Sequence, residues 1–218
     1  MQLITYLENI DQIQEIKDAG IKEVIISPFV LSRFGKVSIE NANYLAMISL
    51  QHNLRPILEW DILMTESVFK KTLSYLEKVN LELFSAVRVQ DTGALNHIIS
   101  LNDKIKIQLI LENGNHNLKG ISKWCTTIHK RLERVVLGQE ITKSNLKKYI
   151  ESLTVPVEYL GLGRILLFYS PRALLQKHFV TNQGEWLEAE ATTEEKKHKD
   201  FKVVENRHGT FMFYPKGF

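Results

Sequence analysis

The sequence predicts an α/β protein: a TIM-barrel-like (β/α) repeat of parallel strands, incomplete or open, followed by a small C-terminal β meander. Three observations support this fold class. Short apolar runs rich in β-branched residues recur along the chain, segments with helical spacing separate them, and the part after residue 178 contains short strands without helices. Strands that alternate with helices are typical of a parallel sheet covered by helices.

Seven strands are expected in the first part of the chain. Each run is apolar on both faces, as in a sheet that is buried on both sides. The runs are Leu3–Leu7, Glu23–Phe29, Arg55–Asp61, Ala86–Asp91, Ile105–Asn113, Arg134–Glu140 and Pro156–Leu160. Seven strand–helix units fit a barrel better than an open sheet, and no glycine-rich turn follows the first strand, as a dinucleotide-binding fold would require.

The helices between these strands have apolar residues three or four positions apart and begin at capping residues. Ile10, Ile13 and Ile16 mark the first helix, which ends at Gly20. Side-chain oxygens at a helix start accept hydrogen bonds from free backbone N–H groups. The expected caps are Asn9 or Asp11, Ser38, Thr65, Thr92 and Thr142.

The chain changes in character after residue 178. Strands are expected at 185–190, 201–205 and 210–214, and the charged stretch 194–200 is expected to be a solvated loop. Asn206 and Gly209 predict a hairpin turn, because both residue types tolerate positive φ. We therefore expect a barrel-like domain at residues 1–178 and a β-rich extension at 179–218. An eighth strand–helix unit is missing, so the barrel is open or is completed by the extension or a second chain.

Composition and charge exclude several classes of protein. Of 218 residues, 44% are apolar, and the net charge of +3 is too small to indicate a nucleic-acid or membrane protein. No apolar run approaches the roughly 20 residues that span a bilayer, and the first residues do not resemble a signal peptide. We therefore expect a cytoplasmic protein. Cys125 alone can build neither a disulfide nor a cysteine-ligated zinc or iron–sulfur site within one chain.

Polar side chains gather at the predicted C-terminal ends of the strands, where (β/α) barrels hold their functional groups. A charged residue in a buried strand cannot face the helix layer without a large desolvation cost. Residues expected to point toward the barrel axis are Glu59, Arg88, Gln108 and Glu158. Two interpretations remain open: a structural layer of ion pairs, or a ligand site whose carboxylates act as acid, base or cation ligands. The carboxylates of the second interpretation are Glu59, Glu112, Glu140 and Glu158.

Three other patterns are weaker. Cys125 and His129 lie four residues apart on one helix, which allows a nucleophilic pair, but a small buried thiol is the simpler interpretation. Glu112 and His116 have spacing for a metal, although two ligands do not make a site. A basic stretch indicates either a solvated helix face or a nucleic-acid contact, and it contains Lys123, Lys130, Arg131 and Arg134.

Four segments of the chain, taken together, resemble peptidase family U32, the collagenase-like peptidases. These segments are Arg88–Leu95, Leu132–Thr142, Val155–Arg172 and His208–Phe213. The resemblance implies a barrel-like N-terminal domain. It implies protease activity in some members and, in others, oxygen-independent hydroxylation of ubiquinone precursors or RNA bases with a cysteine-bound iron–sulfur cluster. The positions that match the family pattern are Asp91, Glu140, Glu158 and Arg172.

The sequence departs from this family at the cluster ligands. Leu162 stands where the signature has histidine, and Leu166 and Ala173 stand where it has cysteine. Because iron–sulfur clusters are held by thiolates, we expect the cluster to be absent and expect no other cofactor or metal. The resemblance then implies a shortened, cysteine-less relative.

The expected function is that of a binding or accessory protein whose incomplete barrel is covered by a protein partner or a second copy. One alternative is a hydrolase, a collagenase-like peptidase with Glu140 and Glu158 as catalytic residues. A second alternative is a factor for RNA or quinone-precursor hydroxylation. Whether the protein is an enzyme stays open. The expected ligand-binding residues are Glu59, Arg88, Asp91, Gln108, Glu112 and Arg172.

Overall fold

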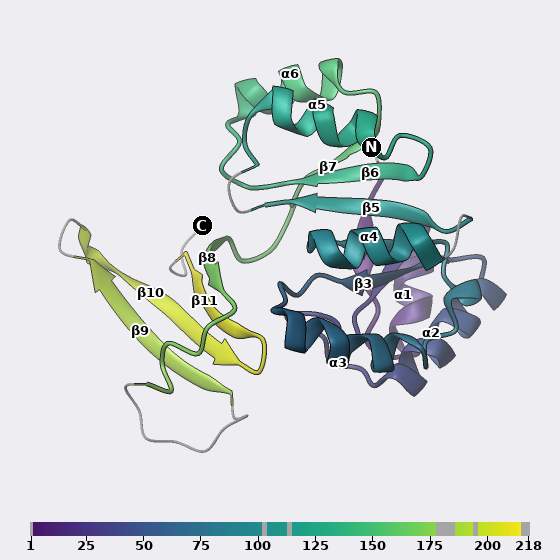
Figure 1. Cartoon of the computed structure of the whole chain (residues 1–218), viewed down its shortest axis with the longest axis horizontal. Coiled ribbons are helices and arrows are strands. Elements are labelled where there is room, and N and C mark those ends of the chain that lie inside the picture. Colours follow the sequence, from purple (N-terminus) through teal and green to yellow (C-terminus); the bar gives the residue numbers. More distant parts are fainter. Residues whose placement is uncertain (1, 102–103, 113–114, 178–185, 194–195, 215–218) are drawn as a thin grey trace. The chain divides into compact units, whose positions relative to one another are not determined.

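Seven parallel strands form one sheet in the computed structural model of the chain, in the order β1-β2-β3-β4-β5-β6-β7 (Figure 1). The structure describes residues 2–101, 104–112, 115–177, 186–193 and 196–214. The strands are β1 Ile4–Tyr6, β2 Glu23–Ile26, β3 Arg55–Trp60, β4 Ala86–Val89, β5 Lys106–Leu111, β6 Leu132–Leu137 and β7 Val157–Glu158. Since β1 and β7 are the two edges, the sheet is an open half-barrel, which confirms the predicted fold class.

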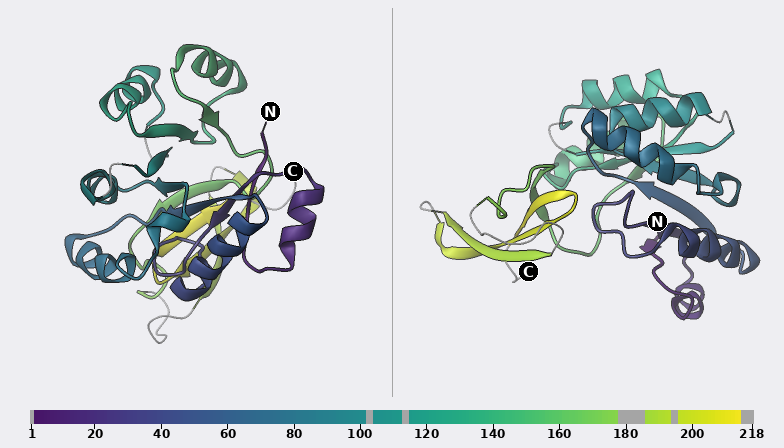
Figure 2. Two further views of the ribbon diagram at one scale, coloured as in Figure 1. Left: turned by 90° about the vertical axis from the view of Figure 1, so that its right-hand side faces the viewer. Right: turned by 60° about the horizontal axis from the view of Figure 1, so that its bottom comes forward.

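Helices connect the strands and cover the outer side of this sheet (Figure 2). They are α1 Gln12–Asp18, α2 Ile39–Gln51, α3 Glu66–Leu76, the 3₁₀ helix η1 Leu81–Leu83, α4 Thr92–Leu101, α5 Leu118–Thr127 and α6 Lys143–Ser152. The predicted caps Ser38 and Thr142 accept N–H groups of α2 and α6. At α4 the capping group is Asp91, whose Oδ1 accepts the N–H groups of Gly93 and Ala94.

Each central strand has one face toward the helices and one toward the inside of the half-barrel. On β2, Val24 and Ile26 belong to the core that packs under the helices, whereas Ile25 between them does not. The same alternation separates Val87 and Val89 of β4 from Arg88. The inner faces therefore carry the polar side chains of the half-barrel, and the helix-side faces carry the apolar core.

A second, antiparallel sheet has the order β8-β11-β10-β9. Its strands are β8 Leu166–Ser170, β9 Leu187–Thr193, β10 Lys196–Asn206 and β11 Gly209–Phe213. The predicted hairpin turn is confirmed, because Asn206 pairs with Gly209 across a two-residue connection. Gly209 has φ +127°, and a Cβ at this position would collide with the carbonyl oxygen of Ser170 on β8.

Two details of the second sheet differ from the sequence-based expectation. The stretch 194–200 was expected to be a loop, but the backbone from Lys196 onward belongs to β10, while 194–195 lie outside the described residues. Strand β8 was not expected at all. Both differences arise because pairing with a neighbouring strand outweighs local composition.

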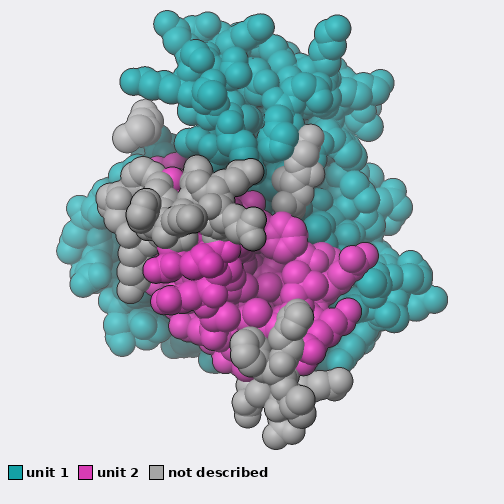
Figure 3. Space-filling view, turned by 90° about the vertical axis from the view of Figure 1, so that its left-hand side faces the viewer, with its two compact units in different colours: residues 1–159 teal, residues 160–218 magenta. Residues whose placement is uncertain are grey.

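The chain forms two compact units, residues 1–159 and residues 160–218, which Figure 3 colours separately. This boundary falls earlier than the domain boundary expected after residue 178, because β8 pairs with β11 of the second sheet. Among the described helices, none is both long and apolar enough to span a membrane.

Candidate functional site

Three arginines and three glutamates pair with one another inside the half-barrel. Arg134 Nη1 lies 2.8 Å from Glu23 Oε2 and 3.2 Å from Glu158 Oε2. Arg88 Nη2 lies 2.7 Å from the same Glu158 oxygen. Arg55 Nη1 is 2.6 Å from Glu23 Oε1. The third glutamate, Glu133, pairs with Arg55. Since the six charges balance, their mutual attraction offsets part of the cost of removing them from water.

Gln108 joins the two sides of this arrangement. Its Oε1 accepts hydrogen bonds from Arg88 Nε at 3.1 Å and Nη2 at 2.8 Å, and its Nε2 donates to Glu133 Oε1 at 2.9 Å. Arg55 also bonds both carboxylate oxygens of Glu133. We call this set the interior ion network: Glu23, Arg55, Arg88, Gln108, Glu133, Arg134 and Glu158.

A β-bulge places two consecutive residues of β6 in the interior ion network. Ile107 pairs with Leu132 and Gln108 pairs with Arg134, so Glu133 is an extra residue in the ladder. Strict alternation would have directed Glu133 to the opposite face from Arg134, whereas a bulge re-aims side chains locally. The sequence analysis therefore missed Glu133, and its assignment of Arg134 to a basic surface stretch was wrong: Arg134 is buried among carboxylates.

Glu59 lies at the C-terminal end of β3 in a different environment. Its Oε2 accepts a hydrogen bond from Ser27 Oγ at 2.6 Å, and its Oε1 accepts one from the Tyr6 hydroxyl at 3.1 Å. The pKa of Glu59 is raised to about 7: burial contributes most to the rise, the nearby carboxylate of Asp61 adds to it, and the charge of Arg88 partly opposes both effects. Glu59 can therefore gain or lose a proton near neutral pH.

The loop between β2 and α2, residues 27–38, packs onto the end of β3. Ser32 Oγ donates to the backbone oxygen of Glu59 at 2.8 Å. The backbone N–H of Arg33 is 2.8 Å from Asp61 Oδ1, Arg33 Nε is 2.6 Å from Asp61 Oδ2, and Arg33 Nη1 is 3.0 Å from Glu112 Oε2. A guanidinium from this loop therefore bridges the carboxyl ends of β3 and β5.

These contacts define the mouth cluster: Tyr6, Ser27, Arg33, Glu59, Asp61 and Glu112. The sequence analysis named Glu59 and Glu112 as candidates but missed Arg33 and Tyr6. A charged residue in a loop carries no periodic signal, and the position of Arg33 follows from how its loop folds back. Tyr6 could have been found from the sequence, because alternation along β1 places it on the same inward face as Ile4.

The two predicted catalytic glutamates lie in different surroundings. Glu158 belongs to the interior ion network, with Arg88 and Arg134 as its partners. Glu140 follows β6 and has a side chain that is 55% exposed, and its Oε2 lies 3.9 Å from Nδ1 of His116. The structure thus pairs Glu140 with an imidazole at the rim and Glu158 with guanidinium groups inside the half-barrel.

The remaining predicted ligand-binding residues have visible structural contacts. Asp91 caps α4 and its Oδ2 accepts the N–H of Met64 at 3.3 Å. Arg172 lies in the second unit, where its backbone oxygen accepts a hydrogen bond from Thr210 Oγ1 at 2.8 Å. The predicted metal ligand Glu112 is bonded to Arg33 in the mouth cluster.

The thiol of Cys125 lies on the buried face of α5, in the helix-side core. Burial raises its pKa above the ordinary value, which disfavours the thiolate form that attacks substrates or binds metals. Within the part of the chain that the structure describes, no group of three or more His, Cys, Asp or Glu side chains could hold a metal ion.

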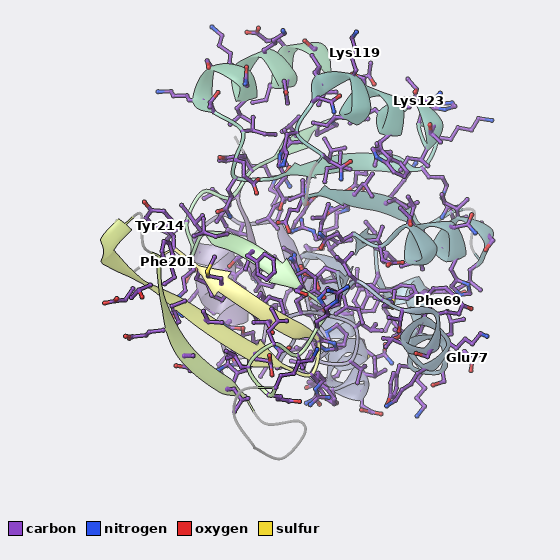
Figure 4. The ribbon with its side chains drawn as sticks, turned by 60° about the vertical axis from the view of Figure 1, so that its left-hand side comes forward. Phe69, Glu77, Lys119, Lys123, Phe201 and Tyr214 are labelled. Carbon is purple, nitrogen blue, oxygen red and sulfur yellow. The ribbon has the colours of Figure 1, made fainter. Side chains whose placement is uncertain are left out.

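A hollow of about 360 Å³ lies on the helix side, beside the first turns of α3 and α4. Its lining includes Phe69, labelled in Figure 4, together with Asn96 and His97. The Phe69 ring is stacked with Trp60, the two ring centroids being 6.2 Å apart. This hollow shares no lining residue with the mouth cluster.

Comparison with known proteins gives a family and several structural likenesses. The sequence pattern described as Peptidase family U32 matches residues 32–216. The structure resembles that of the U32 peptidase Mk0906, with a TM-score of 0.53 and 7% identity over 73% of this chain and 68% of that chain. It also resembles a monomeric form of phosphoribosylanthranilate isomerase from Thermotoga maritima, with a TM-score of 0.42 and 11% identity over 73% and 86% of the two chains. No curated protein matches the sequence.

Proposed function

The chain belongs to peptidase family U32, and from this membership we propose that it is a binding or accessory member whose half-barrel acts as a scaffold. The proposed role does not use the thiolate-based chemistry of the family. The observation that carries it is the interior ion network, in which the inward carboxylates are already engaged by arginines.

A carboxylate that acts as a general acid must change its protonation state near the working pH. Burial alone would raise the pKa of Glu23, but the hydrogen bonds from Arg134 and Arg55 lower it below its ordinary value. Glu158 lies between two guanidinium groups. The lowered pKa makes Glu23 poorly suited to donate a proton, and the ion pairs of Glu158 hold it within the network, which favours the structural interpretation of this layer.

The residues present do not fit the iron–sulfur cluster that some family members carry. Such a cluster is held by cysteine thiolates, and the sequence has one cysteine, which is buried in the helix-side core. The hydroxylation of RNA or quinone precursors that depends on such a cluster would therefore need thiolates from another polypeptide.

The open edges of the half-barrel support an interaction role. Unpaired N–H and C=O groups at a sheet edge favour pairing with another chain, and β1 and β7 are the edges of the seven-stranded sheet. We therefore place a protein partner or a second copy of the chain in the proposed function.

Anaerobic purification followed by iron, acid-labile sulfide and generic peptidase assays tests this proposal. We expect substoichiometric iron, no peptidase activity above background, and no difference between the wild type and Glu140→Gln. Stoichiometric iron and sulfide would overturn it. So would peptidase activity that Glu140→Gln abolishes while the circular dichroism spectrum is unchanged.

A hydrolase is the second candidate, and the pairing of His116 with Glu140 favours it. A carboxylate beside an imidazole is an arrangement found at histidine general bases. Both side chains are about half exposed at the rim. If this candidate is right, His116→Asn and Glu140→Gln each lower peptidase activity. The double variant then has about the same activity as either single variant.

A further inference from the structure

Positive charge is concentrated in residues 117–152. This segment contains eight Lys and Arg against three Asp and Glu, a net charge of +5, whereas the whole chain has 28 against 25 and a net charge of +3. The rest of the chain is therefore slightly acidic. Because Glu133 and Arg134 lie in the interior ion network, the excess belongs to the outer surface of α5, α6 and their connections.

The lysines of the two helices lie on outer faces. Lys119 and Lys123 are four residues apart on α5 and exposed, as Figure 4 shows, while Ile121 and Cys125 of the same helix are buried. Lys143 and Lys147 have the same spacing on α6, where Tyr149 is the buried residue. Two stripes of lysine thus run along the solvent side of the helices.

The two stripes lie on neighbouring helices. Figures 1 and 2 show α5 and α6 next to each other over the same end of the sheet. The Tyr149 hydroxyl of α6 also donates to the backbone oxygen of His116, just before α5, at 2.6 Å. We call this surface the α5–α6 face: Lys119, Lys123, Lys143, Lys147 and Ile150.

Internal contacts do not account for this arrangement. Like charges four residues apart on a helix destabilise it by a few tenths of a kcal/mol. Lys147 has a carboxylate of Glu151 at 4.0 Å. Lys119, Lys123 and Lys143 have no ion pair among the residues that the structure describes. A surface that carries unpaired like charges gains stability when an oppositely charged surface covers it.

We infer that the α5–α6 face binds an acidic surface of a protein partner. This inference rests on the proposed accessory function and names the chemistry of the partner. Ile150 is 55% exposed and follows Lys143 and Lys147 on the same stripe of α6. An apolar residue within a charged rim is the arrangement found at protein interfaces.

A nucleic acid fits the α5–α6 face less well. Proteins that bind single strands present exposed aromatic rings for base stacking, but Trp124 of α5 packs against the helix-side core. All four cations of the face are lysines, and lysine lacks the planar fork with which arginine binds a phosphate through two hydrogen bonds.

The test compares two variants with equal loss of charge. In the face variant, Lys119, Lys123, Lys143 and Lys147 are all replaced by Gln. In the control variant, four other exposed lysines are replaced by Gln: Lys17, Lys22, Lys71 and Lys78. Fluorescence anisotropy measures binding of a labelled, glutamate-rich helical peptide with interspersed leucines, at three salt concentrations, and binding of a labelled twenty-nucleotide oligouridylate under the same conditions.

We expect the peptide to bind the wild type and the control variant with dissociation constants within about twofold, and the face variant about tenfold more weakly. Hydrogen exchange should show protection of α5 and α6 when the peptide is bound. Equal weakening in both variants would overturn the inference, and so would tighter binding of the oligouridylate than of the peptide. A wild-type dimer that the face variant dissociates would also overturn it, by identifying a second copy as the occupant.

The result of this peptide test can be distinguished from the result of the test of the proposed function. A stoichiometric cluster in the iron analysis contradicts the accessory role, whatever the peptide does. Failure of the peptide titration with iron-free, inactive protein leaves the accessory role standing and removes only the acidic partner at this face.

Discussion

The interior ion network and the mouth cluster place the same kind of side chain in two different electrostatic surroundings. In the network, Glu23 is bonded by two arginines that lower its pKa. In the mouth cluster, Glu59 has two hydroxyl groups as its hydrogen-bond partners, and burial raises its pKa to about 7. The comparison shows that direct hydrogen bonds from guanidinium groups lower the pKa of Glu23, whereas burial raises the pKa of Glu59, which is bonded by hydroxyl groups.

The largest expected effect comes from removing a cation of the network. Arg134→Met leaves Glu23 and Glu158 with one fewer partner each, and breaking a buried ion pair costs about 3–5 kcal/mol. Urea unfolding monitored by circular dichroism measures the loss. The control is Lys130→Met, because Lys130 is exposed and lies four residues before Arg134. It should change the free energy of unfolding by less than about 0.5 kcal/mol. A loss below about 1 kcal/mol for Arg134→Met would show that the network is not held by these charges.

The second effect is a pH dependence that originates in Glu59. Its folded-state pKa of about 7 lies above the ordinary value of 4.5, so the folded state binds more protons than the unfolded state between these values. The contribution of Glu59 to stability is therefore present below pH 4.5 and is lost as the pH rises through 7. The loss amounts to about 3 kcal/mol.

Unfolding free energies of the wild type and Glu59→Gln, measured from pH 4.5 to 8, isolate this contribution. As the pH rises from 4.5 toward 8, the unfolding free energy of the wild type should fall relative to that of the variant. The difference should level off above pH 7. A difference that is flat with pH would mean that Glu59 is ionised throughout this interval.

A smaller effect is expected from Ser27→Ala. The Ser27 hydroxyl lies 2.6 Å from Glu59 Oε2 and favours the ionised carboxylate. Its removal should raise the pKa of Glu59 further and cost about 1–2 kcal/mol at pH 8, where the carboxylate carries charge. The NMR chemical shift of the Glu59 carboxyl carbon, followed through the titration, measures the change. A lowered pKa would contradict the assigned hydrogen bond.

The smallest effect is expected at the rim. Glu140 is half exposed and lies 3.9 Å from His116, and solvent-exposed ion pairs contribute about 0–1 kcal/mol. Glu140→Gln should therefore leave the midpoint of urea unfolding nearly unchanged. A large loss of stability would place Glu140 with the network carboxylates and not with the solvated rim groups.

Much of the half-barrel follows from sequence periodicity. Alternation predicted that Arg88, Gln108 and Glu158 face inward, and the structure joins these three side chains by hydrogen bonds. It also predicted the inward position of Glu59, but not the two hydroxyl partners. The choice between a structural layer and a ligand site could not be made from one sequence, because it depends on which charges lie within bonding distance.

Other features had no local signal. Glu133 reaches the network through a bulge whose position depends on the pairing of two strands. Arg33 reaches Asp61 and Glu112 from a loop, and these partners are 28 and 79 residues away along the chain. Strand β8 forms because β11 offers it a partner.

The sequence by itself determined the order of strands and helices, the inward direction of four polar side chains, and the lack of cysteines for a metal cluster. Those properties depend on residue type and spacing, which are local. The tertiary structure alone decided which carboxylates are bonded by arginine and which one, Glu59, has its pKa raised by burial. Coulomb energies and desolvation depend on distances across the sheet, and such distances exist only after the chain has folded.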